Sequence, residues 1–248
     1  MKKKSRTSLG APVTLLLVLA AINGFLYFID NIDALGIRTS ALRNAGIAVT
    51  ELDRYVEYTG ADYIELDNGV PGFTETDYKT ITGENYSKLD HLGRCGAAVA
   101  MLDSSMMPIA EREEIDQIRP SGWKQKKYEG IIDSRPPYLY NRCHLIAYAL
   151  TGQNANERNL ITGTRYFNTI AMLPFEKQVM SYLDESDHHV LYRVTPYFRN
   201  DELVARGVEM EAYSVEDNGA GVCFHVFVYN HQPGVVIDYK TGESRLAS

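Results

Sequence analysis

The chain has 248 residues, a formal net charge of −7, 45% hydrophobic and 23% charged residues, and a sequence pI near 5.4. This composition is that of an ordinary globular protein, and it excludes a disordered tail protein, a collagen-like repeat and a multi-span transporter. The 3 cysteines are too few for a disulfide-rich scaffold, and the overall acidity argues against electrostatic capture of polyanions by the whole surface, although a small basic site can exist on an acidic body.

The first thirty residues have the pattern of an export signal or a membrane anchor. A basic start between Lys2 and Arg6 precedes an apolar stretch from Val13 to Ile29. The stretch is intermediate in length between a signal-peptide core and a full membrane span, and the basic residues favour a cytoplasmic N-terminus. We expect residues 1–30 to be a signal peptide or a retained anchor that contacts the membrane, with the rest of the chain extracellular or anchored facing outside. The alternative is a buried N-terminal helix.

Residues 31–50 have the mixed, glycine-punctuated composition of a linker, and residues 51–248 contain no break long enough to separate two domains. Periodicity predicts the elements of this domain in chain order. They are strands within Tyr55–Leu66 and Leu92–Leu102, a short charged helix over Glu111–Ile118, an amphipathic helix over residues 168–184, and strands within His189–Phe198, Val204–Val215, Val222–Tyr229 and Val235–Tyr239. The predicted fold class is α+β, with a central antiparallel sheet and a loop-rich centre that carries a helix.

Chemically versatile residues concentrate between Asn141 and Glu176. Arg142 and His144 follow an apolar segment that reads as the end of a strand, so a base could lie beside a phosphate-binding cation there. The alternative for this fragment is a structural histidine with satisfied hydrogen bonds. An asparagine-rich loop follows and leads into the predicted helix, where Asn168 and Glu176 are eight residues apart, slightly over two helical turns. An amide oxygen and a carboxylate on one side of a helix are oxygen ligands of the kind that Mg²⁺ prefers.

These residues resemble the motif of the DNA/RNA non-specific endonucleases, which are ββα-metal enzymes of the His-Me finger superfamily. The family pattern is Asp-Arg-Gly-His, then an Asn about fifteen residues on, a metal-binding Asn nine beyond it and a Glu eight further. His144, Asn159, Asn168 and Glu176 keep these intervals. The run from Asn141 to Glu176 is most similar to the DNA-entry nucleases and secreted DNases of Gram-positive bacteria, and it implies a ββα-metal nuclease fold.

The resemblance also implies a division of roles. His144 would be the general base, and Asn168 would be the direct protein ligand of Mg²⁺, with Mn²⁺ as a substitute. Glu176 would orient water around the metal, Arg142 would bind the scissile phosphate, and Asn159 would hold the site together by hydrogen bonds. The product would carry a 5′-phosphate. Partners implied are DNA, with RNA as an alternative substrate.

Two positions depart from the family pattern. The leading Asp is Asn141, and the Gly is Cys143, which is either an inert small residue or half of a disulfide. An exported protein permits oxidation, and Cys95 is the partner to test first, with Cys223 as a free thiol buried in a strand.

Further basic residues are candidates for substrate binding. Arg165 and Lys124 are the cations that we assign to substrate, while Arg119, Lys126 and Lys127 fit substrate binding or an ordinary solvated face equally well. The family also places an arginine some thirty residues before the histidine, and sequence reasoning assigns no residue to it. The predicted function is an exported, Mg²⁺-dependent, sequence-non-specific endonuclease; the alternative is a catalytically silent nucleic-acid-binding module on the same fold.

Overall fold

The computed structural model describes residues 57–110 and 112–247. The expected signal or anchor in residues 1–30 and the expected linker in residues 31–50 lie outside this part of the chain. Among the described residues, no helix combines the length and the hydropathy that a membrane crossing requires.

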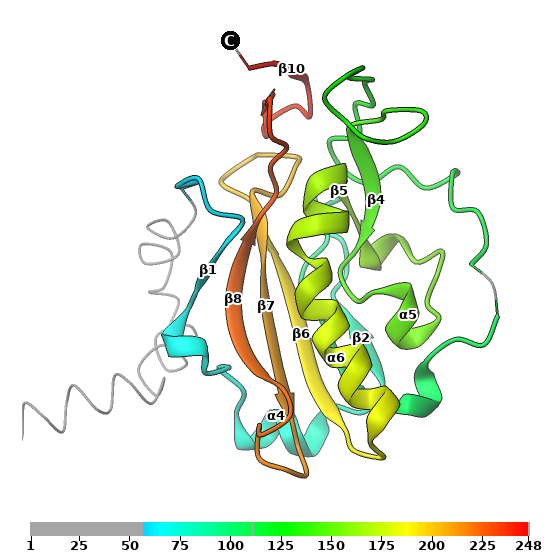
Figure 1. Ribbon diagram of the computed structural model, residues 1–248, viewed down its shortest axis with the longest axis vertical. Coiled ribbons are helices and arrows are strands. Elements are labelled where there is room, and N and C mark those ends of the chain that lie inside the picture. The colour runs from blue at the N-terminus through cyan, green and yellow to red at the C-terminus, as the bar shows by residue number, and fades with distance from the viewer. Residues whose placement is uncertain (1–56, 111, 248) are drawn as a thin grey trace, which may run out of the picture. The chain divides into compact units, whose positions relative to one another are not determined.

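Six strands form one antiparallel sheet at the centre of the predicted α+β architecture (Figure 1). In spatial order they are β1 (Tyr63–Glu65), β8 (Cys223–Tyr229), β7 (Gly207–Ser214), β6 (Val190–Tyr197), β3 (Ala98–Leu102) and β2 (Glu84–Tyr86). All except β2 fall inside ranges that the sequence predicts as strands. Alternation of apolar and polar residues predicts β6 and β7, because a strand presents successive side chains to opposite faces of the sheet.

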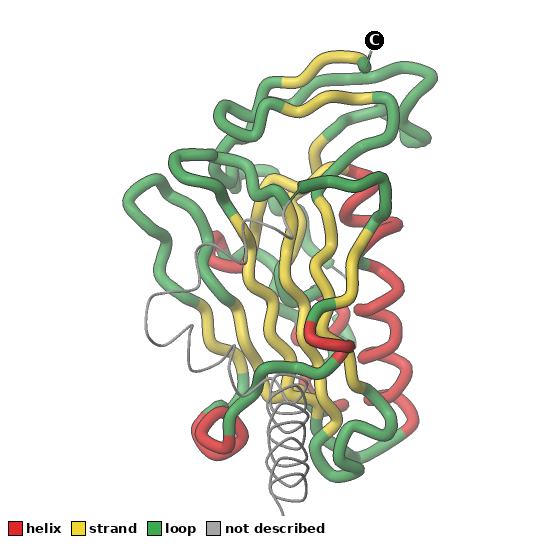
Figure 2. Tube along the Cα trace, turned by 90° about the vertical axis from the view of Figure 1, so that its left-hand side faces the viewer, coloured by secondary structure: helices red, strands yellow, loops and turns green. Residues whose placement is uncertain are grey.

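The two faces of this sheet are covered in different ways. One face packs against α6 (Leu173–Glu185), which runs along it in both Figure 1 and Figure 2. Val190 and Val194 of β6 belong to the same buried apolar cluster as Val179 and Leu183 of α6. The opposite face carries a smaller apolar cluster around Phe227 and, beside it, buried charged residues.

The remaining short elements lie at the ends of the sheet or between its strands. They are η1 (Asp67–Gly69), α4 (Glu75–Thr80), η2 (Ser104–Met106), α5 (Tyr148–Thr151), η3 (Glu157–Asn159), and the hairpin of β9 (Val235–Ile237) with β10 (Ser244–Leu246). Strand β9 lies inside a predicted strand, whereas β10 was not predicted.

A second hairpin carries the residues of the motif. Strand β4 (Tyr140–His144) pairs antiparallel with β5 (Leu160–Thr164), and α6 follows them, which gives the order strand, strand, helix. The sequence predicts a strand that ends at Tyr140, where β4 begins, and it predicts that the residues of β5 belong to an asparagine-rich loop. The arginine and histidine of the motif are therefore strand residues, and pairing with β5 fixes their spacing along β4.

The predicted helix over residues 168–184 is divided in two. Residues Phe167–Ala171 form a π-helical turn, η4, and the α-helix begins only at Leu173, with Pro174 in its first turn. Proline is tolerated there because the first amides of a helix have no intrahelical acceptor. Asn168 thus lies on the π-turn and Glu176 on the α-helix, so the prediction that one continuous helix carries both is wrong.

The predicted helix over Glu111–Ile118 is also wrong for its described part, residues 112–118, which form turns and extended chain. The carbonyl oxygens of Asp116 and Ile118 accept hydrogen bonds from the side chain of Arg142 instead of from amides further along a helix. A tertiary contact therefore outweighs the local preference of this charged segment.

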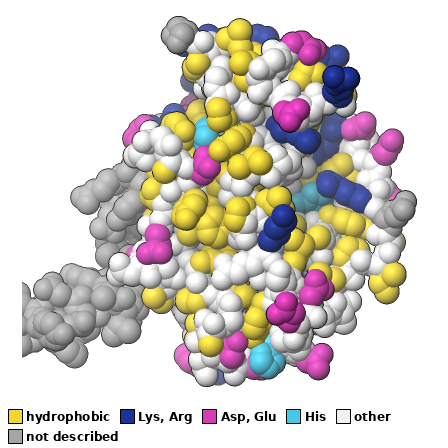
Figure 3. All heavy atoms as spheres, in the orientation of Figure 1, with side chains coloured by type: hydrophobic (Ala, Val, Ile, Leu, Met, Phe, Trp, Pro, Cys, Tyr) yellow, Lys and Arg dark blue, Asp and Glu magenta, His cyan; other side chains and the backbone are white. Residues whose placement is uncertain are grey.

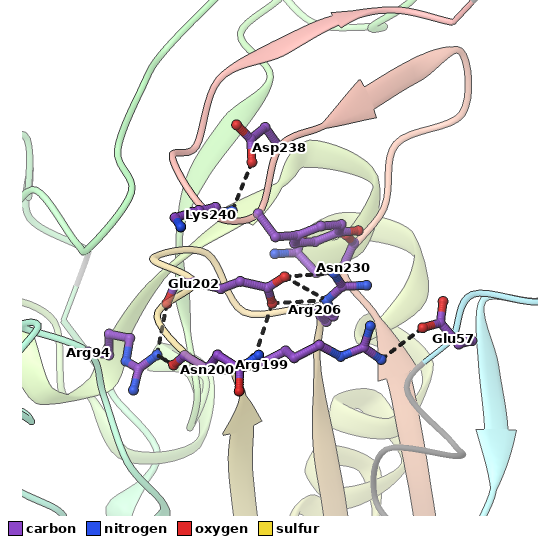
Figure 4. Close-up of polar contacts among 10 residues, drawn as sticks. Glu57, Arg94, Arg199, Asn200, Glu202, Arg206, Asn230, Asp238 and Lys240 are labelled. Carbon is purple, nitrogen blue, oxygen red and sulfur yellow. Dashed lines mark hydrogen bonds and ion pairs between the residues drawn. The ribbon is translucent and has the colours of Figure 1, made fainter.

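Polar side chains hold the hairpin and the neighbouring loops to the central sheet. Asn230 directly follows β8. Its side-chain nitrogen donates to the carbonyl oxygens of Thr162 and Ala205, and its side-chain oxygen accepts from the backbone amide of Thr164, all within 3.0 Å. Figure 4 shows the adjacent loop between β6 and β7, where the Glu202 carboxylate accepts two bonds from Arg206 Nε and one from Arg206 Nη2. The bonds of Asn230 hold β5, and with it the start of η4, to the sheet, and the Glu202–Arg206 pair holds the β6–β7 loop.

Candidate active site

His144 lies at the end of β4 with only 6% of its surface exposed. Its Nε2 is 2.9 Å from the carbonyl oxygen of Asn154, and its Nδ1 is 3.2 Å from Nη2 of Arg112. A carbonyl oxygen can only accept, so Nε2 carries the ring hydrogen, and Nδ1 of the neutral ring keeps its lone pair. Nδ1 is therefore the nitrogen that can take up a proton.

The environment of His144 keeps its ring neutral. Burial is the main cause that lowers its pKa, to about 4, and the guanidinium of Arg112 acts in the same direction. Hydrogen bonds to the backbone of Asn154 and Gln153 oppose this effect and are outweighed. A neutral imidazole is the form that a general base requires, and its Nδ1 lone pair, which here accepts a hydrogen bond from Arg112 Nη2, must leave that bond to take up a proton.

Asn159 is fully buried and holds the segment that follows His144. Its side-chain oxygen accepts from the amide of Ile146, its side-chain nitrogen donates to the carbonyl of Ile146, and both distances are 2.9 Å. The backbone carbonyl of Asn159 also accepts from the amide of Leu145. The arrangement matches the structural role that the motif implies for this residue.

Arg142 points from β4 to the segment 112–118. Its Nε donates to the carbonyl of Ile118 at 2.6 Å, and its two terminal nitrogens donate to the side chain and the carbonyl of Asp116 at 2.8 and 2.7 Å. The guanidinium also lies over the ring of Trp123, 4.5 Å from its centroid. A guanidinium has five N–H donors, so these three bonds leave two donors for a ligand.

A cleft of about 780 Å³ opens over this hairpin. Among the described residues, its walls carry one carboxylate, Asp116, against the five arginines Arg112, Arg119, Arg135, Arg142 and Arg165. Figure 3 shows Lys and Arg side chains gathered around a hollow on the right-hand side of the molecule. The cleft is therefore locally basic on a chain whose net charge is −7.

Asn168 and Arg165 line this same cleft, whereas Lys124 does not. Lys124 lies in a shallower groove that shares Arg119, Trp123 and Gln125 with the cleft, and its Nζ is 3.8 Å from the carboxylate of Glu243. The structure thus brings Asn168, Arg142 and Arg165 together and leaves Lys124 at the margin.

Two side chains offer oxygen ligands for a hard divalent cation: Asn168 lines the cleft, whereas Glu176 lies outside its lining. The side-chain amide of Asn168 makes no hydrogen bond to any described residue, so its oxygen is available as a ligand. Glu176, on the first turn of α6, is 8% exposed, and burial raises the pKa of its carboxyl to about 7. Mg²⁺ takes oxygen ligands and needs only one or two from protein, which these side chains can supply.

A second group of metal-ligating side chains lies on the opposite face of the sheet. Glu209, Glu211 and His225 place ligand atoms within 4.8 Å of one another. However, Glu209 Oε1 is 2.6 Å from His225 Nε2, and Glu211 Oε2 is 2.6 Å from Arg193 Nε. Contacts with these carboxylates and Asp67 outweigh burial and raise the pKa of His225 to about 9. A protonated histidine and an arginine therefore provide the positive charge that a metal would otherwise supply.

The structure contains no disulfide among the three cysteines, all of which it describes as free thiols. Cys95 Sγ donates to the carbonyls of Glu157 and Leu160, whereas Cys143 Sγ lies 3.5 Å from the sulfur of Met172. Of the two alternatives for Cys143, the disulfide with Cys95 is therefore not formed, and Cys223 is exposed, where a buried thiol was predicted. Cys143 has room because Gly163 lies beside it: a Cβ at position 163 would be 2.7 Å from the Cβ of Cys143. Burial raises the pKa of its thiol well above the ordinary value, so Cys143 is an inert apolar filler.

Sequence reasoning missed Arg112, which contacts His144 directly. It lies 32 residues before the histidine, the interval at which the family pattern places an arginine. The interval could have identified Arg112, but the charged residues around it favour a solvent-exposed helix, and the segment was predicted as such. The structure shows this segment crossing the site, where the side chain of Asn154 also donates to the carbonyl of Glu113.

Comparisons with known proteins show to which family the chain belongs. Residues 74–216 match the family model of the DNA/RNA non-specific endonucleases. A deoxyribonuclease from Streptococcus dysgalactiae subsp. equisimilis is 33% identical over 125 residues, which cover 48% of this chain and 35% of the relative, so the match spans about a third of that relative's length.

Two solved structures extend the likeness. NucA from Streptococcus agalactiae with magnesium bound is 27% identical, with a TM-score of 0.65, over 77% of this chain and 90% of NucA. The Sda1 nuclease with a bound zinc ion is 26% identical, with a TM-score of 0.60, over 75% of this chain and 96% of Sda1. Since the family model covers more than half of the chain, the resemblance predicted from the motif is confirmed: this chain belongs to the DNA/RNA non-specific endonuclease family and has its nuclease fold.

Proposed function

We propose that the protein is an exported, Mg²⁺-dependent, sequence-non-specific endonuclease that hydrolyses DNA, with RNA as an alternative substrate, and that His144 is its general base. The observation that carries the proposal is the hydrogen bonding of the His144 ring. Nε2 is committed to the carbonyl of Asn154, and Nδ1 lies toward Arg112 in the wall of a basic cleft.

The chain's own groups account for the proton transfer and for the charge on the phosphate. Nδ1 of His144 accepts a proton from the attacking water as the new P–O bond forms and the bond to the 3′-oxygen breaks. The two free donors of Arg142, together with Arg112, stabilise the negative charge that builds on the phosphate oxygens. Asn168 would hold Mg²⁺, or Mn²⁺ in its place, and Glu176 would fix the geometry around it. The bound ion would supply further positive charge at the phosphate and the departing oxygen.

The charge distribution supports binding without sequence preference. Contacts from arginines to phosphate carry no base information, and Arg119, Arg135 and Arg165 extend the basic lining beyond the reacting phosphate. Because the body of the protein is acidic, attraction of a polyanion must come from these local cations. We therefore expect strong inhibition by salt.

A plasmid assay tests the proposal. The purified full chain is incubated with supercoiled plasmid and Mg²⁺, with EDTA in a parallel sample, and across salt from roughly 50 to 500 mM. We expect cleavage with Mg²⁺, none with EDTA, and a steep loss of rate with salt. Cleavage that resists EDTA would contradict the metal dependence, and plasmid binding without cleavage would support the silent binding module instead.

Export rests on the basic and apolar pattern of residues 1–30. Intact mass measurement of the native protein recovered from culture medium and from membranes separates a cleaved signal from a retained anchor. Full-length protein found only in the cytoplasmic fraction would contradict export.

A further inference from the structure

Two polar groups that lack hydrogen-bond partners lie between β6 and α6. The hydroxyl of Tyr192, in the middle of β6, is the one fully buried side-chain oxygen or nitrogen of the described residues for which the structure provides no partner. Tyr192 itself is 0% exposed. Buried polar groups are nearly always hydrogen-bonded, because an unpaired one loses its solvation without compensation, so this exception needs an explanation.

The Tyr192 hydroxyl lies on the side of the sheet that faces the site. Tyr192 belongs to the cluster that packs against α6, in alternation with Arg193, whose side chain contacts Glu211 on the opposite face. Glu176 occupies the same buried stripe of α6 as Val179 and Leu183, and it is directed toward the sheet. After burial, the charges that raise the pKa of Tyr192 are those of Glu176 and then Cys143.

The carboxylate of Glu176 also lacks a hydrogen-bond partner among the described residues. Burial is the sole cause of its raised pKa, with no donor acting in the other direction. The thiol of Cys143 is directed to the carbonyl of His144 and to Met172, so it does not supply the donor. An unused donor on β6 and an unused acceptor on α6 are therefore buried in the two elements that pack against each other.

We propose that the hydroxyl of Tyr192 positions the carboxylate of Glu176, through one buried water molecule that accepts from the hydroxyl and donates to the carboxylate. A bridging water would satisfy both groups, which do not bond each other directly. Tyr192 does not line the cleft, so it acts on the reaction only through Glu176. This inference rests on the proposed function, in which Glu176 fixes the geometry around Mg²⁺.

The test is Tyr192→Phe, which removes the hydroxyl and keeps the ring. We expect the variant to fold, and its kcat and its affinity for Mn²⁺ to fall by about 10- to 100-fold, as for loss of groups that support a metal site from outside its direct ligands. The KM for DNA should stay unchanged because no substrate contact is lost. Mn²⁺ affinity is measured by calorimetry on the full chain without DNA, which gives a readout independent of turnover.

A purely structural role predicts the opposite pattern. Removing a buried hydroxyl that has no partner should leave the melting temperature unchanged or raise it, and should not alter kcat or Mn²⁺ binding. Tyr182→Phe is the matched control, since it removes a hydroxyl from the far end of α6 that bonds Asp217 and His188. We expect this control to lower stability and to leave Mn²⁺ binding unchanged.

A double-mutant cycle with Glu176→Gln decides whether Tyr192 acts through Glu176. If it does, Tyr192→Phe has almost no further effect on kcat or Mn²⁺ affinity in the Glu176→Gln background. Additive effects, or a Tyr192→Phe variant with wild-type kcat and Mn²⁺ affinity, would overturn the inference. Failure of the proposed function itself would be seen earlier, as a wild-type protein without Mg²⁺-dependent cleavage.

Discussion

Two buried histidines lie on different sides of this molecule, and their surroundings give them opposite charges. His144 contacts an arginine and a backbone carbonyl, and its pKa is lowered to about 4, mainly by burial. His225 contacts Asp67 and Glu209, and these carboxylates outweigh burial and raise its pKa to about 9. Burial alone therefore does not identify a catalytic histidine, because the charge of its neighbours decides whether it is a base or half of an ion pair.

The same contrast applies to metal binding. Carboxylates surround His225, but Arg193 and the protonated imidazole already neutralise them. The cleft near His144 has few carboxylates, yet it presents an amide oxygen without a protein partner beside several arginines. A site for a metal that meets a phosphate needs such unused oxygens more than it needs a dense acidic cluster.

The largest expected effect is that of His144→Ala. Loss of a general base should reduce kcat by about 10²- to 10⁴-fold, while the protein stays folded. Initial rates of plasmid cleavage at saturating Mg²⁺ measure the effect, and a thermal melt checks the fold. The control is His189→Ala, which removes an exposed histidine paired with Glu216. Cleavage at the wild-type rate by His144→Ala would exclude the assignment of the base.

His225→Leu should affect stability where His144→Ala affects catalysis. The substitution removes the positive charge that faces the carboxylates of Glu209, Glu211 and Asp67. Loss of one partner of a buried ion pair lowers the free energy of unfolding by about 3–5 kcal/mol. Denaturant unfolding measures the loss, and kcat per folded molecule should not change.

A companion variant keeps this prediction testable if His225→Leu folds poorly. The double variant Glu209→Gln, His225→Leu removes the charge of one of the carboxylates that contact His225 and should recover part of the stability. If the cluster on this face were instead a metal site, Mn²⁺ would raise the melting temperature of the wild type, and His225→Leu would abolish that shift.

The two histidines should also give opposite pH dependences of stability. The folded pKa of His225 lies above its ordinary value of 6.5, so its contribution is complete below pH 6.5 and is lost as the pH rises through about 9. The folded pKa of His144 lies below 6.5, so stability falls as the pH drops from 6.5 toward about 4. Each shift corresponds to on the order of 3 kcal/mol.

The measurement is the difference in unfolding free energy between each histidine variant and the wild type, from pH 4 to 10. Differences are needed because Glu176, whose pKa is raised to about 7, contributes in the opposite sense to His144 between pH 4.5 and 7. A wild-type advantage over His225→Leu that does not shrink above pH 6.5 would contradict the ion-pair assignment.

The two histidines also differ in how much of their environment the sequence predicts. Spacing predicts His144 as the base, because the intervals to Asn159, Asn168 and Glu176 follow the family pattern, and alternation of apolar and polar residues predicts β6 and β7. Both signals are local or nearly so. The sequence gives no comparable signal for His225, whose partners come from η1 and β7, so its ion pairs depend on how the sheet assembles.

Other errors have the same physical origin. Charged residues between Glu111 and Ile118 favour a helix locally, but Arg142 binds the carbonyls of this segment and holds Arg112 beside His144. The asparagine-rich segment contains a strand because β4 provides a pairing partner that is distant in the sequence. In each case a tertiary partner, invisible to a local pattern, selects the conformation.

Within the basic cleft, Arg165→Gln should have a moderate effect. Arg165 lines the cleft beside Asn168, and its guanidinium makes no ion pair with any described residue. We expect kcat/KM for DNA to fall by about tenfold, and the slope of log kcat/KM against log salt to become shallower by about one, as for loss of one phosphate contact. Rates at several salt concentrations test this, and an unchanged slope would show that Arg165 does not contact phosphate.

Lys124→Gln should have the smallest effect, because Lys124 lies in the marginal groove and faces Glu243 across 3.8 Å. An exposed, paired lysine contributes little, so we expect a change in kcat/KM of about threefold or less. Glu243→Gln removes the competing carboxylate and should raise kcat/KM slightly, but only while Lys124 is present. A Lys124→Gln effect as large as that of Arg165→Gln would mean that substrate follows the shared residues Arg119 and Trp123 into the shallow groove, and the binding site would then extend beyond the cleft.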